Sequence, residues 1–247
     1  MTLSAAERLT AAGHAALPWA NPLDAEGWER LLARTAAELG DGGGRRGLDI
    51  GCGPGLLAHR LSERLPGLHL RGIDRNPRFI ERAQALPALP RLRFECLDAA
   101  ALDPDERFDL LLCVGASQAF GTPREALASC QRLLRPGGLL LWADIEWAAE
   151  PPQALLDFLD CPRELYWPRG ALPEQGWQAL HEEVASAAAW QHYESTVGGA
   201  RRAEAERLDD SESRAQWRLR QRAWDAAWDA DGRHCFGFHA HLLRALP

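Results

Sequence analysis

The sequence predicts an α/β fold in which helices cover both faces of a doubly wound, mostly parallel sheet. Short apolar segments typical of buried strands alternate with helical segments between residues 46 and 145. The first of these strands runs into a glycine-rich turn, and 247 residues, of which 46% are hydrophobic, can bury a substantial core. Strands alternating with helices imply right-handed crossovers, so the strands should be parallel and ligands should bind at their carboxyl ends.

Two helices are predicted to form an N-terminal helical cap over residues 1–45. Ser4 and Glu7 form a capping box, and apolar residues at helical spacing continue this first helix to about Ala16. A second helix is expected from Asp24 to Leu39. The glycine run that follows breaks the chain before the first strand.

Residues 46–145 are predicted to form the ligand-binding core. Its strands and helices are expected, in order, at Gly47–Ile50 (strand), Leu56–Leu65 (helix), His69–Ile73 (strand), Pro77–Leu86 (helix), Leu92–Glu95 (strand), Phe108–Val114 (strand), a helix capped by Thr122 and Glu125, and Leu139–Ala143 (strand).

The pattern loosens in residues 146–247, where we expect a C-terminal helical insertion and the last strands of the sheet. A strand is predicted at Trp177–Val184, helices at Ser186–Arg202 and Ser211–Trp228, and an antiparallel last strand at Cys235–Leu243. His239 and His241 alternate along that strand and so share a face. Because no cysteine or carboxylate stands near them at ligand spacing, we predict partly exposed strand residues and no metal site.

Composition narrows the classes of partner. The formal net charge of -7 disfavours nucleic acid, which usually binds through clustered basic residues. No stretch approaches the roughly 20 apolar residues of a membrane span, and the first residues lack a secretory pattern, so a cytoplasmic protein without a membrane partner is expected. The six scattered cysteines indicate neither a disulfide framework nor a zinc site.

The segment Leu48-Asp-Ile-Gly-Cys-Gly-Pro-Gly55 carries the strongest chemical signal. Three alternating glycines let a ligand lie against bare backbone near a helix N-terminus. Asp74 ends the next strand, where a carboxylate can accept both ribose hydroxyls of an adenosine. The same spacing with Ala58 also fits the dinucleotide pattern, so this motif by itself leaves S-adenosylmethionine and NAD both open.

Later segments give the chain a more specific resemblance. It resembles the class I S-adenosylmethionine-dependent methyltransferases, which have a Rossmann-like fold, in segments that follow one another in the order typical of that family. These segments are Leu48–Gly55, Gly72–Arg75, Leu97–Ala99, Phe108–Gly121 and Leu134–Leu141.

The resemblance implies S-adenosylmethionine as methyl donor and S-adenosylhomocysteine as product. Gly51 to Gly55, with Cys52 as a tolerated small residue, would contact the methionine end. Asp74 would bind the ribose and Asp98 the adenine amino group, and Val114 to Ala116 would form the rim of the sulfonium pocket. The full set of implied cofactor residues is Asn21, Asp49, Gly51, Cys52, Gly53, Gly55, Asp74, Arg75, Asp98, Ala99, Val114, Gly115 and Ala116.

A narrower resemblance is to bacterial members of this superfamily that have Asn-Pro-Leu in an N-terminal cap and Gly-Ala-Ser-His-Ala-Phe-Gly after the fourth strand. This chain has Asn21-Pro-Leu23 and Gly115-Ala-Ser-Gln-Ala-Phe-Gly121. This chain departs from those relatives at Gln118, where they have histidine. An amide cannot take the proton that a histidine there would accept, so Gln118 cannot replace such a histidine as a base.

The acceptor is expected to be a small molecule, methylated on nitrogen or oxygen and less readily on sulfur or carbon. Eight of the ten tryptophans follow residue 140, in the segment expected to cover the strand ends. They favour an aromatic-lined acceptor pocket, with core packing as the alternative for Trp217, Trp224 and Trp228. A hydroxyl acceptor usually needs a base, whereas an amine needs only a free lone pair. Catalytic candidates are Gln118, Glu146, Tyr193 and His192, and substrate-binding candidates are Ser117, Trp142, Trp147 and Trp190.

Three other functions stay open at this point. An NAD-dependent oxidoreductase is disfavoured because the chain has no lysine and hence no Tyr-x-x-x-Lys pair. A non-catalytic S-adenosylmethionine-binding module has the same motifs. Methylation of RNA or protein is opposed by the acidic balance and by Gly115-Ala-Ser-Gln118, which replaces the Pro-Pro-Tyr type of segment.

The protein is expected to be a monomer or homodimer.

Overall fold

A computed structural model describes residues 4–168 and 176–246 of the chain. Its strands form one seven-stranded sheet in the order β3-β2-β1-β4-β5-β7-β6. The elements in chain order are α1 (Ala5–Ala15), α2 (Ala25–Leu39), β1 (Arg46–Ile50), α3 (Leu56–Arg64), β2 (His69–Asp74), α4 (Pro77–Gln84), β3 (Leu92–Cys96), η1 (Ala99–Ala101), β4 (Phe108–Val114), η2 (Ser117–Ala119), α5 (Pro123–Leu133), β5 (Leu134–Trp147), α6 (Gln153–Leu159), η3 (Arg163–Leu165), β6 (Trp177–Val184), α7 (Ala187–Ala205), α8 (Ser211–Ala227), η4 (Trp228–Gly232), α9 (Arg233–Cys235) and β7 (Phe236–Ala245).

The pairing of the strands confirms a mostly parallel sheet with an antiparallel last strand. β1 to β5 are parallel to their neighbours, and β7 lies antiparallel between β5 and β6. The chain moves outward through β2 and β3 on one side of β1 and through β4 and β5 on the other. The order therefore reverses between β1 and β4, and the crevice at their carboxyl ends is where such sheets bind ligands.

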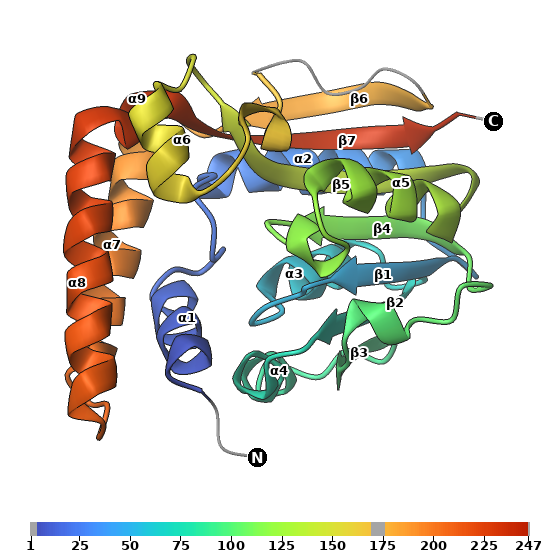
Figure 1. The fold of residues 1–247 in the computed structure, drawn as a ribbon. Coiled ribbons are helices and arrows are strands. Elements are labelled where there is room, and N and C mark those ends of the chain that lie inside the picture. Colours follow the sequence, from blue (N-terminus) through green and yellow to red (C-terminus); the bar gives the residue numbers. More distant parts are fainter. Residues whose placement is uncertain (1–3, 169–175, 247) are drawn as a thin grey trace.

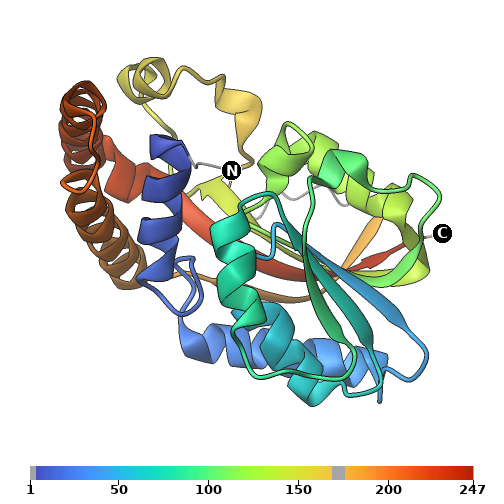
Figure 2. The same ribbon diagram turned by 90° about the horizontal axis from the view of Figure 1, so that it is seen from below.

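Helices cover both faces of this sheet, as the alternation predicted. α2 and α3 lie on one face and α5 on the other (Figure 2). The buried side of α2 repeats at helical spacing through Trp28, Leu31, Leu32, Thr35 and Leu39, so a single apolar stripe meets the strands. Removal of these side chains from water stabilises the layered fold.

Three helices from opposite ends of the chain stand together beyond the carboxyl ends of the parallel strands (Figure 1). α1 packs against α7, and α7 packs against α8. The predicted capping box at Ser4 and Glu7 is present and starts α1. The Arg8 guanidinium then donates to Glu204 Oε1 at 3.0 and 2.9 Å, which ties α1 to α7. The sequence did not predict that these segments meet.

The fifth strand is longer than expected. Leu139–Ala143 was predicted, but β5 runs from Leu134 to Trp147. The extension past Ala143 contains Asp144 and Glu146, which broke the apolar run in the sequence. Backbone pairing with β7 nevertheless continues from Leu139 to Trp147. The partner strand makes the hydrogen bonds that the backbone of these polar residues needs. The sequence of this segment does not reveal that partner.

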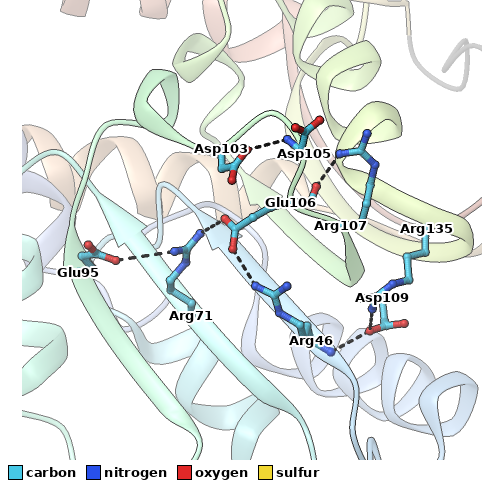
Figure 3. Close-up of polar contacts among 9 residues, drawn as sticks. All are labelled: Arg46, Arg71, Glu95, Asp103, Asp105, Glu106, Arg107, Asp109 and Arg135. Atoms are coloured by element: carbon cyan, nitrogen blue, oxygen red, sulfur yellow. Dashed lines mark hydrogen bonds and ion pairs between the residues drawn. The ribbon is translucent and has the colours of Figure 1, made fainter.

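Ion pairs hold the amino ends of the parallel strands (Figure 3). Glu106 accepts from Arg46 at 2.7 Å and from Arg71 at 2.7 Å, which joins the starts of β1 and β4 to β2. Asp109 accepts from the Arg46 N–H at 2.8 Å and from Arg135 at 2.6 Å. This edge lies at the opposite ends of the strands from the glycine-rich turn.

Among the helices of residues 4–168 and 176–246, none has the length and apolar character that a membrane span requires.

Candidate functional site

The glycine-rich turn after β1 lies directly against the loop after β4. Gly51 has φ +67, and a Cβ added there would lie 2.5 Å from the Cβ of Ala116. Only glycine therefore allows the two loops to approach so closely. The sequence places both segments in the expected site, and the structure brings them together at the reversal of strand order.

Gly53 and Asp74 form an open, polar part of this turn. Gly53 has φ +53, and a Cβ built there would meet no described atom within 4 Å. Its N–H donates to Asp74 Oδ2 at 3.1 Å, while the Asn76 N–H donates to Oδ1 at 2.8 Å. Burial raises the pKa of Asp74, and these two N–H donors oppose that rise. The carboxylate is thus held in place beside bare backbone.

Asp49, at the penultimate position of β1, is a buried carboxyl group with only 2% of its surface exposed. Burial, and then the nearby charge of Asp74, raise the pKa of Asp49 to about 8. Two carboxyl groups near each other in a low-dielectric site favour protonation of one of them. A cationic ligand group placed here would favour the ionised form instead.

The surroundings of the other predicted cofactor residues differ from one another. Asp98 is exposed and caps η1 by accepting from the Ala100 N–H at 2.9 Å. Arg75 is exposed, Ala99 is buried, and Val114 is half-buried. Asn21 Oδ1 accepts from the Leu23 N–H and the Trp28 indole, both at 3.0 Å, so its side chain organises the N-terminal loop.

Cys52 lies between the motif glycines with 8% of its surface exposed. Burial raises the pKa of its thiol well above the usual range, and the charges of Asp49 and Asp74 raise it further. The thiolate, which is the reactive form, is therefore disfavoured.

Asp144 is a buried acid beside the predicted substrate residue Ser117, and it was not among the residues predicted from the sequence. It lies on β5 with 8% of its surface exposed, and burial raises its pKa to about 6, against the Ser117 hydroxyl and the Ile145 N–H, which lower it. The predicted substrate residue Ser117 is thus paired with a buried acid. Its neighbour Gln118 is exposed and donates to the Gly115 carbonyl at 3.2 Å. The signal for Asp144 in the sequence was an acid directly after the apolar run Leu139–Ala143.

The remaining catalytic candidates fall into three different surroundings. Glu146 is buried, and its Oε2 lies 3.1 Å from Nδ1 of His239. The Tyr193 hydroxyl lies 3.2 Å from Nε2 of His14, in the contact between α7 and α1. Burial raises the pKa of Tyr193 to about 12 and lowers that of His14 to about 4. His192 is on the exposed side of α7.

One predicted tryptophan, Trp147, lines a pocket of about 430 Å³ at the carboxyl end of β5, and Trp142 is not among the lining residues. Trp147 forms part of its wall and meets Tyr166 edge to face, with ring centroids 5.3 Å apart. Trp142 meets Trp167 in the same manner at 6.4 Å. The lining residues are Arg124, Trp147, Ala148, Ala149, Glu150, Arg163, Glu164, Tyr166 and Pro168.

Trp190 is not among the residues that line that pocket and lies in an aromatic cluster of the core. Its ring contacts Trp228, Tyr193 and Phe238 at centroid distances of 5.7, 5.5 and 6.4 Å. Trp224 stacks on Trp228 in the same cluster. Core packing, the alternative for the late tryptophans, therefore accounts for Trp224 and Trp228.

The expectation for the two histidines of the last strand was wrong. His239 and His241 were predicted to be partly exposed, but each has only 5% of its surface exposed. Their rings lie 3.9 Å apart, and burial lowers the pKa of His241 to about 3. β7 lies between β6 and β5, so residues of both neighbouring strands flank the two rings, which the sequence of a single strand does not reveal.

Comparisons with known proteins match the same part of the chain. A family model described as a methyltransferase domain matches residues 48–140. Trans-aconitate 2-methyltransferase of Methylobacterium radiotolerans is 34% identical over 126 residues, which are 51% of this chain and 46% of that protein. The chain spans less than half the length of the curated relatives it matches.

Two solved structures resemble nearly the whole chain. The protein YjhP of E. coli has a TM-score of 0.77 at 25% identity, over 91% of this chain and 94% of that one. A Geobacter sulfurreducens S-adenosylmethionine-dependent methyltransferase, solved with S-adenosyl-L-homocysteine, has a TM-score of 0.81 at 22% identity, over 96% and 98%. The chain therefore has the same Rossmann-like fold, including its helical additions.

Proposed function

Residues 48–140 of this chain belong to the methyltransferase domain family, and on that premise we propose that the protein transfers a methyl group from S-adenosylmethionine to a small-molecule acceptor. Residues 46–145 would bind the donor. Residues 1–45 and 146–247 would cover it and provide the acceptor site.

One observation carries the proposal for the donor. At the reversal of strand order, Gly53 presents bare backbone to open space, and its N–H together with that of Asn76 fixes the Asp74 carboxylate. An adenosine ribose offers two hydroxyls to such a carboxylate. The buried acid Asp49 suits the cationic methionine end. S-adenosylmethionine supplies an electrophilic methyl group on a sulfonium, so the protein has to align the acceptor and exclude water.

The substitution Asp74→Ala tests the donor site. Loss of hydrogen bonds to a charged group should weaken S-adenosylmethionine binding about 10- to 100-fold in calorimetric titration. Asp105→Ala is the matched control, because Asp105 is exposed near the amino-end ion pairs (Figure 3) and should leave the affinity unchanged.

The same titrations distinguish the rival functions. Unchanged affinity in Asp74→Ala would refute the site assignment, and tight binding of NAD without binding of S-adenosylmethionine would support an oxidoreductase. Incubation with labelled donor and a metabolite extract tests transfer itself. Tight donor binding with no labelled product would favour a non-catalytic binding module.

The pocket at the end of β5 is our candidate for the acceptor site. Trp147 and Tyr166 provide an apolar wall, and Arg124 and Arg163 stand beside Glu150 and Glu164 around it. Such a mixture suits a small molecule with an apolar part and a polar group. Tyr166→Ala should lower methyl transfer at least about tenfold without changing donor affinity. Phe158→Ala, which removes an exposed aromatic ring from the neighbouring α6, is the control.

For the methylated atom we propose nitrogen or oxygen. A hydroxyl acceptor requires a base, and Asp144 is better suited to that role than an ordinary carboxylate because its pKa is raised to about 6. Ser117 follows β4, and Asp144 lies near the carboxyl end of β5. The two residues are in contact. Identification of the labelled product by mass spectrometry decides the atom.

A further inference from the structure

We propose that His239, His241 and Glu182 form a binding site for a divalent transition-metal cation of the Zn²⁺ type, with Glu146 holding His239 in position. The site is separate from the donor-binding turn, and the proposal does not depend on methyl transfer. Its basis is the way in which three strands bring these side chains to one face of the sheet.

Strand register places the residues together. His241 lies opposite Glu182 of β6 and opposite Trp142 of β5, and His239 lies opposite Val184 and Asp144. Directly opposed residues of antiparallel strands point to the same face, and so do residues two positions apart on one strand. One ligand atom from each of Glu182, His239 and His241 lies within 4.8 Å of the others.

The distances between these atoms suit a small cation. Nε2 of His239 is 3.4 Å and Nδ1 of His241 is 4.0 Å from Oε2 of Glu182. With bonds of about 2.0–2.1 Å, the ligand atoms of a tetrahedral zinc site are about 3.3 Å apart. The Glu182 side chain is 65% exposed and can adjust toward the two buried rings.

The contacts of the two ring nitrogens of His239, Nδ1 and Nε2, also favour a metal at this position. Nδ1 lies 3.1 Å from Oε2 of Glu146, and in the tautomer that donates from Nδ1 to this carboxylate the lone pair is on Nε2. Nε2 is buried and makes no hydrogen bond within the described parts of the chain, although it faces Glu182. A buried imidazole nitrogen without a hydrogen bond costs free energy, which a metal bond would offset.

His239 and Glu146 resemble a metal-binding histidine and the carboxylate that holds its ring in position. Ligand histidines almost always donate their other N–H to a carboxylate or carbonyl, which fixes the tautomer and the ring. Two imidazoles and one carboxylate suit zinc and neighbouring divalent metals better than Ca²⁺ or Mg²⁺, which prefer oxygen ligands. Three protein ligands leave a fourth position for water or another ligand.

Metal titration of the full chain tests the proposal. Chelator-treated protein should bind one Zn²⁺ per chain in calorimetry, and Co²⁺ in its place should give the visible absorption of a tetrahedral site. Glu182→Gln should lower Zn²⁺ affinity at least about tenfold. Glu146→Ala removes the acceptor for the His239 Nδ1–H and should lower Zn²⁺ affinity about 10- to 100-fold. Glu182 is exposed, so its replacement should leave the fold intact, as circular dichroism can check.

Glu183→Gln is the matched control. Glu183 neighbours Glu182 on β6, but its carboxylate pairs with Arg30 of α2 at 2.8 Å. Its replacement should leave Zn²⁺ affinity unchanged. The proposal is overturned if the wild-type chain binds no Zn²⁺, or if Glu182→Gln binds it as tightly as the wild type. Equal losses in Glu182→Gln and Glu183→Gln would also overturn it, since they would indicate binding at another surface of β6.

Discussion

Asp49 shows how one buried carboxyl group links the proposed donor site to the stability of the fold. Its pKa is raised from 3.8 to about 8, mainly by burial and then by Asp74. Between these pH values the folded chain retains a proton that the unfolded chain has released. Stability therefore falls as pH rises through this window, because the folded state binds more protons there.

The substitution Asp49→Asn isolates this effect. The variant cannot lose the proton, so its free energy of unfolding relative to the wild type should increase from pH 5 to pH 8, by at most about 1.4 kcal/mol per pH unit. Urea unfolding at several pH values measures it. Parallel pH curves for variant and wild type would show that Asp49 has an ordinary pKa in the folded chain.

At the scale of elements, the contact between α1 and α7 depends on a small residue. A Cβ added at Gly13 would lie 2.9 Å from Cγ1 of Val197 and 2.9 Å from Nε of Arg201. Gly13→Ala should therefore separate the two helices and lower the free energy of unfolding by about 1–3 kcal/mol. Thermal or urea unfolding checks this, and a variant as stable as the wild type would show that the contact is loose.

A second glycine in the same pair of helices should behave in the opposite way. A Cβ added at Gly199 of α7 would meet no described atom within 4 Å. Alanine loses less backbone freedom than glycine when it folds into a helix, so Gly199→Ala should stabilise the protein by about 0.5–1 kcal/mol. The same unfolding measurement serves both variants. A loss of stability in Gly199→Ala would indicate that α7 needs glycine there for another reason.

At the scale of the whole molecule, donor binding should stabilise the entire fold. The proposed site joins loops after β1, β2 and β4, and α1 and α7 stand beyond them (Figure 1). A ligand that binds only the folded chain, present at 100 times its Kd, adds about 2.7 kcal/mol. S-adenosylhomocysteine should then raise the Tm by about 5–10 °C. NAD is the control, and equal shifts with both ligands would contradict the choice of donor.

Local signals in the sequence predicted most elements of the fold. Capping boxes at Ser4 and Thr122 start α1 and α5, and the glycine turn joins β1 to α3. Such signals act within a few residues, so each can be recognised in its own segment. The boundaries differ most at β5, where pairing with β7 extends the strand through Asp144 and Glu146.

The sequence by itself thus determined the alternation of strands and helices, the glycine turn and the acidic residue that ends the second strand. Only the tertiary structure decided that α1 meets α7, that Asp144 stands beside Ser117, and that Glu182 joins His239 and His241. The physical reason is that periodicity and capping depend on neighbours in the chain. Burial, raised or lowered pKa values and shared ligand sites depend on which distant strands pair, and no local pattern specifies that pairing.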